Sequence, residues 1–167
     1  MQFGLTIPLQ RFLHIKTLCY GDSLDTLYCW DLHKILLHGE PSLLAVHCAS
    51  RFTFVLYAMS AVDWDNLDVI AYSGIERSLL EAAMPQEAIH NYLERAGTPQ
   101  QTKTHGRREV AYLNRAWDDV TALDYTIDIE QQWQTLLNHS VNEIPCRCAA
   151  REQKASAFEH LAALLQY

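Results

Sequence analysis

The spacing of the apolar residues changes near residue 62 of this chain. Before that point the apolar residues form short runs rich in β-branched and aromatic side chains, which is the pattern of β-strands. After it they recur every three or four residues almost to the end, as on amphipathic helices. The change predicts an α+β fold, in which a small, mainly antiparallel sheet from the N-terminal third packs against about five helices.

The strongest strand patterns span residues 43–48 and 52–59, and the link between them has the length of a hairpin turn. Shorter strands, the last of them at a sheet edge, are expected at residues 3–6, 27–30, 34–37 and 98–104. The two that are separated only by residues 31–33 either flank a tight turn or form one bent strand. The sequence leaves both alternatives open.

Helical spacing predicts a short helical turn near the N-terminus and then longer helices at residues 63–82, 85–97, 107–123, 130–140 and 155–165. Asp63 is a suitable N-cap, Pro85 suits a first helical turn, and Gly97 is a suitable C-terminal stop. With 167 residues the chain has the size of one domain, strand-rich over residues 1–60 and helix-rich over residues 61–167.

Composition is typical of a folded cytoplasmic protein. Hydrophobic residues make up 49% and charged residues 20%, which are ordinary values. No apolar run approaches the ~18 residues of a membrane span, and we expect no signal peptide. The cysteines are scattered rather than spaced as a disulfide framework, so reduced thiols are expected. They are Cys19, Cys29, Cys48, Cys146 and Cys148.

The net charge of −7 is unevenly distributed. Residues 101–117 hold four basic residues and one acidic residue, a net charge of +3. They stand between residues 63–100, at −5 (two basic, seven acidic), and residues 118–145, at −6 (no basic, six acidic). An acidic chain of this kind is a poor general binder of nucleic acid.

One polar stripe on the predicted helix at residues 107–123 is the main candidate site. Arg107, Asn114 and Asp118 fall on one line at helical spacing, beside the apolar stripe. Arg107 places a positive charge at the helix start, where the helix dipole disfavours it, which suggests another partner. Two interpretations stay open: an anion-binding site at a cleft edge, or a structural polar network. The apolar stripe is expected to consist of Val110, Leu113, Trp117 and Val120.

Histidines and cysteines gather on the predicted strands, at His33, His38, His47, Cys29 and Cys48. The sequence lacks the paired C-x₂₋₄-C spacing of a zinc site, so no metal and no other cofactor is predicted. Adjacent strands could still bring Cys29 and Cys48, or His33 and His47, together. The sequence also lacks the nucleophile elbow and the H-E-x-x-H helix, so no catalytic residue is predicted.

Several short motifs follow one another along most of the chain: Thr6 with Leu9, Tyr28-Cys29-Trp30, Ser50-Arg51-Phe52, Asp63-Trp64, Thr102-Lys103-Thr104, Arg107 with Asn114, and Val141-Asn142 before Ile144-Pro145. In this order they resemble a bacterial domain family of unknown function, made of small stand-alone proteins. Some proteins of this type are similar to products of mobile gene cassettes. The resemblance adds Asn142 to the candidate binding residues and implies no established reaction or cofactor.

The chain departs from the family pattern at three places. Ala111 and Tyr112 stand where the family has small residues, including glycine, between the Arg and the Asn. Arg115 stands where the family has an Asp, and Gly39-Glu40 replace a basic pair. A family site at these places would be altered in this chain.

The sequence favours a non-enzymatic binding or interaction module that forms a homodimer. Four Trp and eight Tyr supply contact surface, and Trp30 and Arg51 are candidate anchors at a binding surface. The expected partner is another protein or a small anionic ligand, with no membrane. The alternative is a small enzyme for an anionic or nucleotide-like substrate, with Arg107 and Asn114 as binding residues and His105 or His47 as acid or base. A third interpretation pairs the acidic segments with a basic partner.

Overall fold

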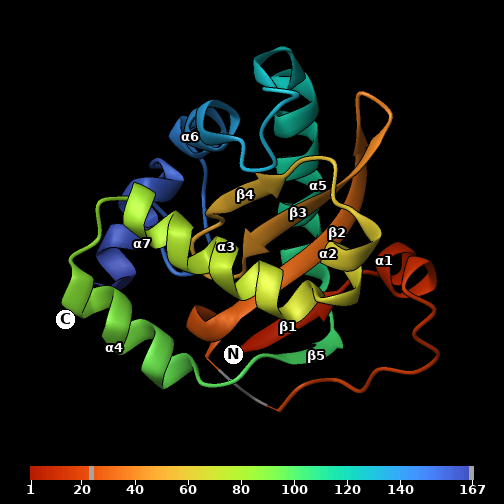
Figure 1. Ribbon diagram of the computed structural model, residues 1–167. Helices are drawn as coiled ribbons and strands as arrows, with labels where there is room; N and C mark the ends of the chain where they lie inside the picture. Colours follow the sequence, from red (N-terminus) through yellow and green to blue (C-terminus); the bar gives the residue numbers. More distant parts are fainter. Residues whose placement is uncertain (23–24, 166–167) are drawn as a thin grey trace.

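A five-stranded mixed sheet forms the centre of the molecule (Figure 1). The computed structural model describes residues 1–22 and 25–165, and its strands stand in the order β4-β3-β2-β1-β5. Their bounds are β1 (Gln2–Leu5), β2 (Cys29–Leu37), β3 (Glu40–His47), β4 (Thr53–Leu56) and β5 (Gln100–Lys103). The pairings β2–β3 and β3–β4 are antiparallel, whereas β1 pairs in parallel with both β2 and β5.

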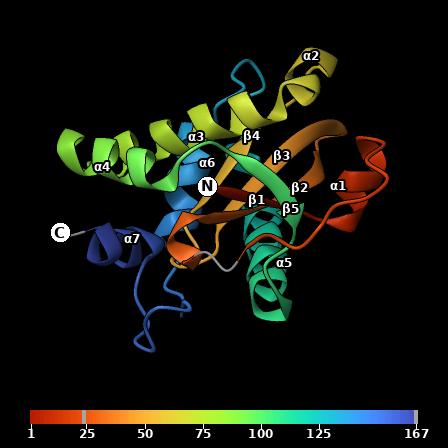
Figure 2. The ribbon, with the colours of Figure 1, turned by 90° about the horizontal axis from the view of Figure 1, so that it is seen from below.

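Seven α-helices of the described residues surround the sheet. They are α1 (Ile7–Phe12), α2 (Ala61–Asp65), α3 (Leu67–Glu81), α4 (Gln86–Ala96), α5 (Arg107–Ala122), α6 (Thr135–Glu143) and α7 (Ala157–Leu165). Figure 2 shows α3 and α4 on one side of the sheet and α5 on the other. Each side has its own core, because α3, α4 and α7 bury apolar side chains against one face and α5 and α6 against the other.

The predicted α+β class is confirmed, and the sheet is mixed: its longest pairing, β2 with β3, is antiparallel, and β1 adds parallel pairings at the other side. Two of its four strand pairings are parallel, because both neighbours of β1 run in the same direction as β1. These neighbours are β2 and, after three helices, β5, and parallel neighbours need such crossover connections. The strand predicted at residues 98–104 is the edge strand β5. The single strand β2 settles the open choice for residues 27–37 against a tight turn.

Strand β2 contributes to both cores, since successive side chains of a strand point to opposite faces. Trp30 enters the core beneath α3 and α4, and Ile35 enters the core beneath α5. The residues of β2 that precede Ile35 on its own face are polar or weakly polar: Cys29, Asp31 and His33. The sheet therefore presents a buried polar region on the α5 side.

Two helix starts differ from the prediction. Ser60, not Asp63, caps α2, since the Ser60 hydroxyl accepts from the Asp63 N–H while the Asp63 carboxylate accepts from the Ser60 N–H. The chain bends at Asn66, so the predicted helix at residues 63–82 consists of α2 and α3. Helix α6 begins only at Thr135, because Trp133 pairs with the end of β4 instead.

Helix α5 is rotated from the predicted apolar stripe. Trp117 is 40% exposed and lies edge-on to His33, with ring centroids 5.0 Å apart, and Val110 is only partly buried. The helix turns a carboxylate toward the polar region of the sheet, and its buried side chains are Glu109, Leu113, Ala116 and Val120.

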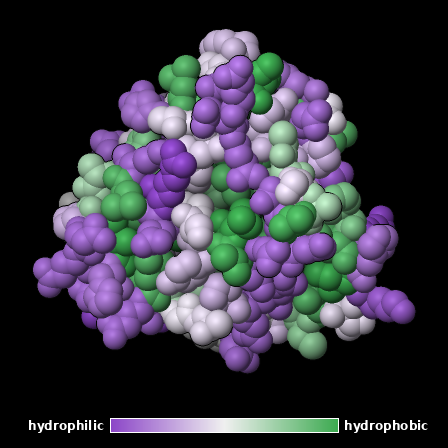
Figure 3. All heavy atoms as spheres, viewed as in Figure 1, coloured by the Kyte–Doolittle hydropathy of each residue, from purple (hydrophilic) through white to green (hydrophobic). Residues whose placement is uncertain are grey.

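The outer surface over α3 and its neighbours carries small apolar patches separated by hydrophilic side chains (Figure 3). Exposed apolar residues of α2 and α3 include Val62, Val69 and Leu80. None of the helices in the described ranges combines the length and the apolar character that crossing a bilayer requires.

Two asparagines of α6 cover the outer edge of β4. The amide of Asn142 accepts from the Thr53 N–H at 2.8 Å and donates to the Thr53 carbonyl at 2.6 Å. Asn138 makes the same two contacts with Val55, at 2.8 and 3.4 Å. The distance between the two asparagines along α6 matches the distance between their partners along β4, because four helical residues rise about 6 Å and two strand residues about 6.7 Å. The side chains thus occupy an edge that is otherwise open to pairing with another strand.

We predict that Asn142→Ala lowers the free energy of unfolding by about 2–3 kcal/mol, because it leaves the buried Thr53 N–H and carbonyl unpaired. Denaturant unfolding measures the change. The matched control Asn114→Ala removes an exposed asparagine of α5 and should stay within about 0.5 kcal/mol of the original chain. Equal losses in the two variants would contradict the edge-covering role.

Candidate functional site

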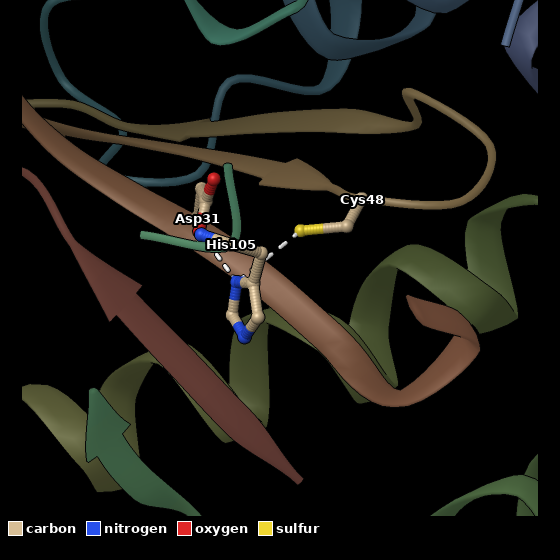
Figure 4. A group of neighbouring side chains, drawn as sticks. All are labelled: Asp31, Cys48 and His105. Atoms are coloured by element: carbon tan, nitrogen blue, oxygen red, sulfur yellow. Dashed lines mark hydrogen bonds and ion pairs between the residues drawn. The ribbon is translucent and has the colours of Figure 1, made fainter. Parts of the chain in front are cut away.

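Asp31, Cys48 and His105 bring a carboxylate, a thiol and an imidazole together in the interior (Figure 4). Asp31 lies on β2, Cys48 directly follows β3, and His105 lies in the link between β5 and α5. One ligand-type atom of each lies within 4.8 Å of those of the other two. Asp31 and Cys48 are almost fully buried, and the His105 side chain is 11% exposed.

Gly4 of β1 makes room for this cluster. It pairs with Asp31 on one side and with Thr102 on the other. A Cβ atom on Gly4 would overlap the Asp31 carboxylate and stand 2.9 Å from both Nδ1 of His105 and Cα of Thr104. The parallel strand between β2 and β5 therefore needs glycine at this position.

Both ring nitrogens of His105 face oxygen acceptors. Nδ1 lies 2.7 Å from Oδ1 of Asp31, and Nε2 lies 3.1 Å from Oε1 of Gln2. The Gln2 amide is oriented by its own nitrogen, which donates to the Asp22 carbonyl at 3.0 Å, so its oxygen meets the histidine. A histidine that donates from both nitrogens is an imidazolium.

The pKa of His105 is correspondingly high. Burial disfavours the imidazolium, but the hydrogen bond to Asp31, assisted by Cys29 and by the negative charge of Asp31, outweighs burial and raises the pKa of His105 to about 9. Burial raises the pKa of Asp31, and its hydrogen bonds with His105 oppose that rise. Because Asp31 accepts from His105, the aspartate is the ionised partner and the histidine the protonated one.

Asp31 leaves one oxygen without a partner. Oδ1 accepts from the His105 ring and, at 3.4 Å, from the His105 backbone N–H. Oδ2 is buried and has no hydrogen-bond partner among the described residues. A buried polar atom left unpaired costs about 1–3 kcal/mol, and more when it is charged. In native structures such an atom commonly has a water molecule or an ion beside it.

Cys48 is a neutral thiol in this arrangement. Its Sγ lies 3.5 Å from Nδ1 of His105, and burial, with the nearby negative charge of Asp31, raises the pKa of the thiol well above its usual range. The thiol and the carboxylate approach the same ring nitrogen. A catalytic relay would need them on different nitrogens, so the cluster does not activate Cys48 as a nucleophile.

Glu109 adds a second buried carboxylate close to the cluster. It lies in the first turn of α5, where the helix dipole stabilises negative charge, and is 6% exposed. Its Oε1 accepts from the Arg108 guanidinium at 3.0 and 2.8 Å. Beside burial, the charge of Glu109 contributes to the raised pKa of Asp31. Because Glu109 is itself paired with Arg108, it adds no unpaired negative charge to the cluster.

The stripe predicted on α5 lies elsewhere. Arg107, Asn114 and Asp118 are all exposed, so the helix carries them on its solvent side rather than beside the sheet. A structural network that docks α5 through these residues is therefore wrong. Their role in binding an anion stays a prediction.

The other predicted binding residues are not brought together. Trp30 is fully buried on the opposite face of the sheet and donates to the Tyr92 hydroxyl at 3.0 Å. Arg51 lies over the Tyr112 ring and donates to the Arg147 carbonyl at 3.2 Å. The side-chain amide of Asn142 is hydrogen-bonded to the edge of β4.

The two buried strand histidines are hydrogen-bonded to neighbouring groups. His47 contacts the Ser50 hydroxyl at 2.7 Å and the Leu27 carbonyl at 2.8 Å, and burial lowers its pKa to about 4. His33 contacts the Thr6 hydroxyl at 2.7 Å. Of the two predicted acid–base candidates, only His105 lies in the cluster.

Comparison with known proteins gives a family but no activity. Residues 2–157 match the model of a family described as a domain of unknown function, DUF6933. The chain belongs to this family. Membership in DUF6933 confirms the resemblance to a domain family of unknown function, and the matched range includes Asp31, Cys48 and His105. No curated protein and no solved structure matches this DUF6933 chain.

We predict that His105 titrates with a pKa of about 9, above its ordinary value of 6.5. Since the pKa is higher in the folded state, the ion pair stabilises the fold fully below pH 6.5 and loses this contribution as the pH rises through about 9. NMR titration of the His105 ring measures the pKa. In Asp31→Asn the pKa should fall, because burial then acts with little opposition. A His105 pKa at the ordinary value in the original chain would contradict the imidazolium.

Proposed function

We propose that this protein is a binding module for a divalent transition-metal ion, with zinc as the best match, held by Asp31, Cys48 and His105. The observation that carries the proposal is the unpaired, buried Oδ2 of Asp31 beside a thiol and an imidazole. Zinc is bound in proteins by carboxylate oxygen, thiolate sulfur and imidazole nitrogen. Calcium and magnesium require all-oxygen surroundings and do not suit this set.

The charges in the cluster favour the replacement of two of its protons by a divalent ion. An ionised Asp31, a protonated His105 and a neutral Cys48 together carry no net charge. A divalent ion that displaces the proton on Nδ1 and the thiol proton again gives no net charge, since carboxylate and thiolate then balance the ion. Binding therefore leaves no uncompensated charge in the interior, which is the main obstacle to burying ions.

The cluster must open slightly to hold an ion. Two ligands about 2.0 Å from one tetrahedral zinc stand about 3.3 Å apart, whereas Oδ1 of Asp31 and Nδ1 of His105 are 2.7 Å apart. The 3.5 Å between Sγ of Cys48 and Nδ1 already suits two ligands of one ion. The required change is a shift of roughly 0.6 Å in the carboxylate, or its rotation to present Oδ2.

Three protein ligands leave a fourth position for water or another small ligand. The proposal keeps the binding module expected from the sequence but departs from it in the ligand, since the sequence predicted a protein or a small anionic ligand and no metal. The alternative, a small enzyme built around Arg107 and Asn114, has less support, because both residues are exposed and substrate sites are usually enclosed.

We predict that the chelator-stripped protein binds one zinc ion per chain, and that Cys48→Ser and Asp31→Asn bind it at least about tenfold more weakly. Competition with a chromophoric chelator measures the affinity. Cobalt(II) provides a second readout, because a thiolate-to-cobalt charge-transfer band should appear in the original chain and disappear in Cys48→Ser.

The matched control is Cys19→Ser, which removes an exposed thiol and should leave both readouts unchanged. Far-ultraviolet circular dichroism verifies that each variant is folded. If zinc binds equally well to Cys48→Ser and Cys19→Ser, or binds to none of the proteins, the proposal is wrong.

A further inference from the structure

A partly open hollow lies on the opposite face of the sheet from the cluster. It is a cavity of about 200 Å³ bordered by β4, α3, α6 and α7, which gather on one side of the molecule in Figure 1. Four aromatic side chains line it: Phe52, Phe54, Trp133 and Phe158. None of these residues takes part in the metal proposal.

The wall is made of ring contacts. Phe54 stacks on Trp133 with centroids 5.6 Å apart, and Phe52 meets Phe158 edge-on at 5.3 Å. Phe52, Phe54 and Trp133 are at least 92% buried, whereas Phe158 is only partly buried. Such a wall suits the flat apolar body of an aromatic ligand.

The polar groups deep in the cavity already have partners. The Ser78 hydroxyl donates to the Gly74 carbonyl at 2.8 Å. The amides of Asn138 and Asn142 are held by β4, and the Trp133 indole N–H donates to Oε1 of Glu81 at 2.8 Å. A ligand therefore finds an apolar interior, and its polar group must lie at the mouth.

One carboxylate, that of Glu81, lines the cavity. It pairs with the Arg77 guanidinium at 3.2 Å, and Arg77 also lies over the Trp133 ring, 4.7 Å from its centroid. Arg77 donates to the same oxygen of Glu81 that receives the Trp133 indole. The other oxygen, Oε2, is left for a further donor. A cationic donor is the complementary group for this second oxygen.

We propose that this cavity binds a small aromatic amine: one aromatic ring placed among Phe52, Trp133 and Phe158, with a primary ammonium group on Oε2 of Glu81. The size agrees, because a cavity of about 150 Å³ lined by apolar side chains accommodates benzene. The ammonium reaches the partly exposed rim, where it keeps part of its hydration.

The test uses 2-phenylethylamine and its neutral counterpart 2-phenylethanol, which share the same ring. The indole N–H signal of Trp133, assigned through Trp133→Phe, reports binding by NMR. We expect the amine to shift this signal saturably and the alcohol to bind about tenfold more weakly, through loss of one charge-assisted hydrogen bond. Glu81→Gln keeps an acceptor for the indole and should make the two affinities equal.

Two further variants control the test. Glu76→Gln removes an exposed carboxylate of α3 and should leave the difference between the probes intact. Phe158→Leu keeps much of the side-chain volume and should weaken the binding of both probes. The proposal is overturned if neither probe gives a saturable shift, if both bind the original chain equally, or if dilution of the protein alone shifts the Trp133 signal, which would assign the cavity to a second copy of the chain.

Discussion

The buried hydrogen bond between the His105 imidazolium and the Asp31 carboxylate ties three parts of the fold together. It links β2 to the segment that leaves the edge strand β5, and it fixes the start of α5, which begins two residues after His105. Removing one partner of such a pair leaves an unpaired charge in the interior, at a cost of about 3–5 kcal/mol. The position of α5 over the polar part of the sheet therefore depends on this contact.

The same contact explains the composition of its surroundings. Gly4 has no side chain because a Cβ atom would occupy the space of the carboxylate. Gln2 is buried and oriented so that its oxygen faces the second ring nitrogen. The unpaired oxygen of Asp31 is the one part of the arrangement that the protein itself does not satisfy within the described residues, and the metal proposal accounts for it.

The sequence was sufficient for the class of the fold and for most elements, because strands such as β4 and helices such as α4 have clear apolar spacing. It was not sufficient for the parallel pairing of β1 or for the cluster. The antiparallel pairing of β2 with β3 brings Asp31 close to Cys48, and the parallel pairing of β1 with β2 and β5 brings His105, far away in sequence, to both. The available signal was the polar alternation Cys29, Asp31, His33 within an otherwise apolar strand. The polar stripe on α5 was predicted beside the buried face but is exposed, because helical spacing reveals which residues share a face but not which face is buried.

The most direct test of this account is the number of protons released when zinc binds, measured calorimetrically near neutral pH in buffers of different ionisation enthalpy. An imidazolium hydrogen-bonded to Asp31 and a neutral Cys48 thiol predict the release of about two protons per zinc ion, falling to about one in Cys48→Ser. Zinc binding without proton release, or with equal release in both proteins, would contradict the protonation states on which the account depends.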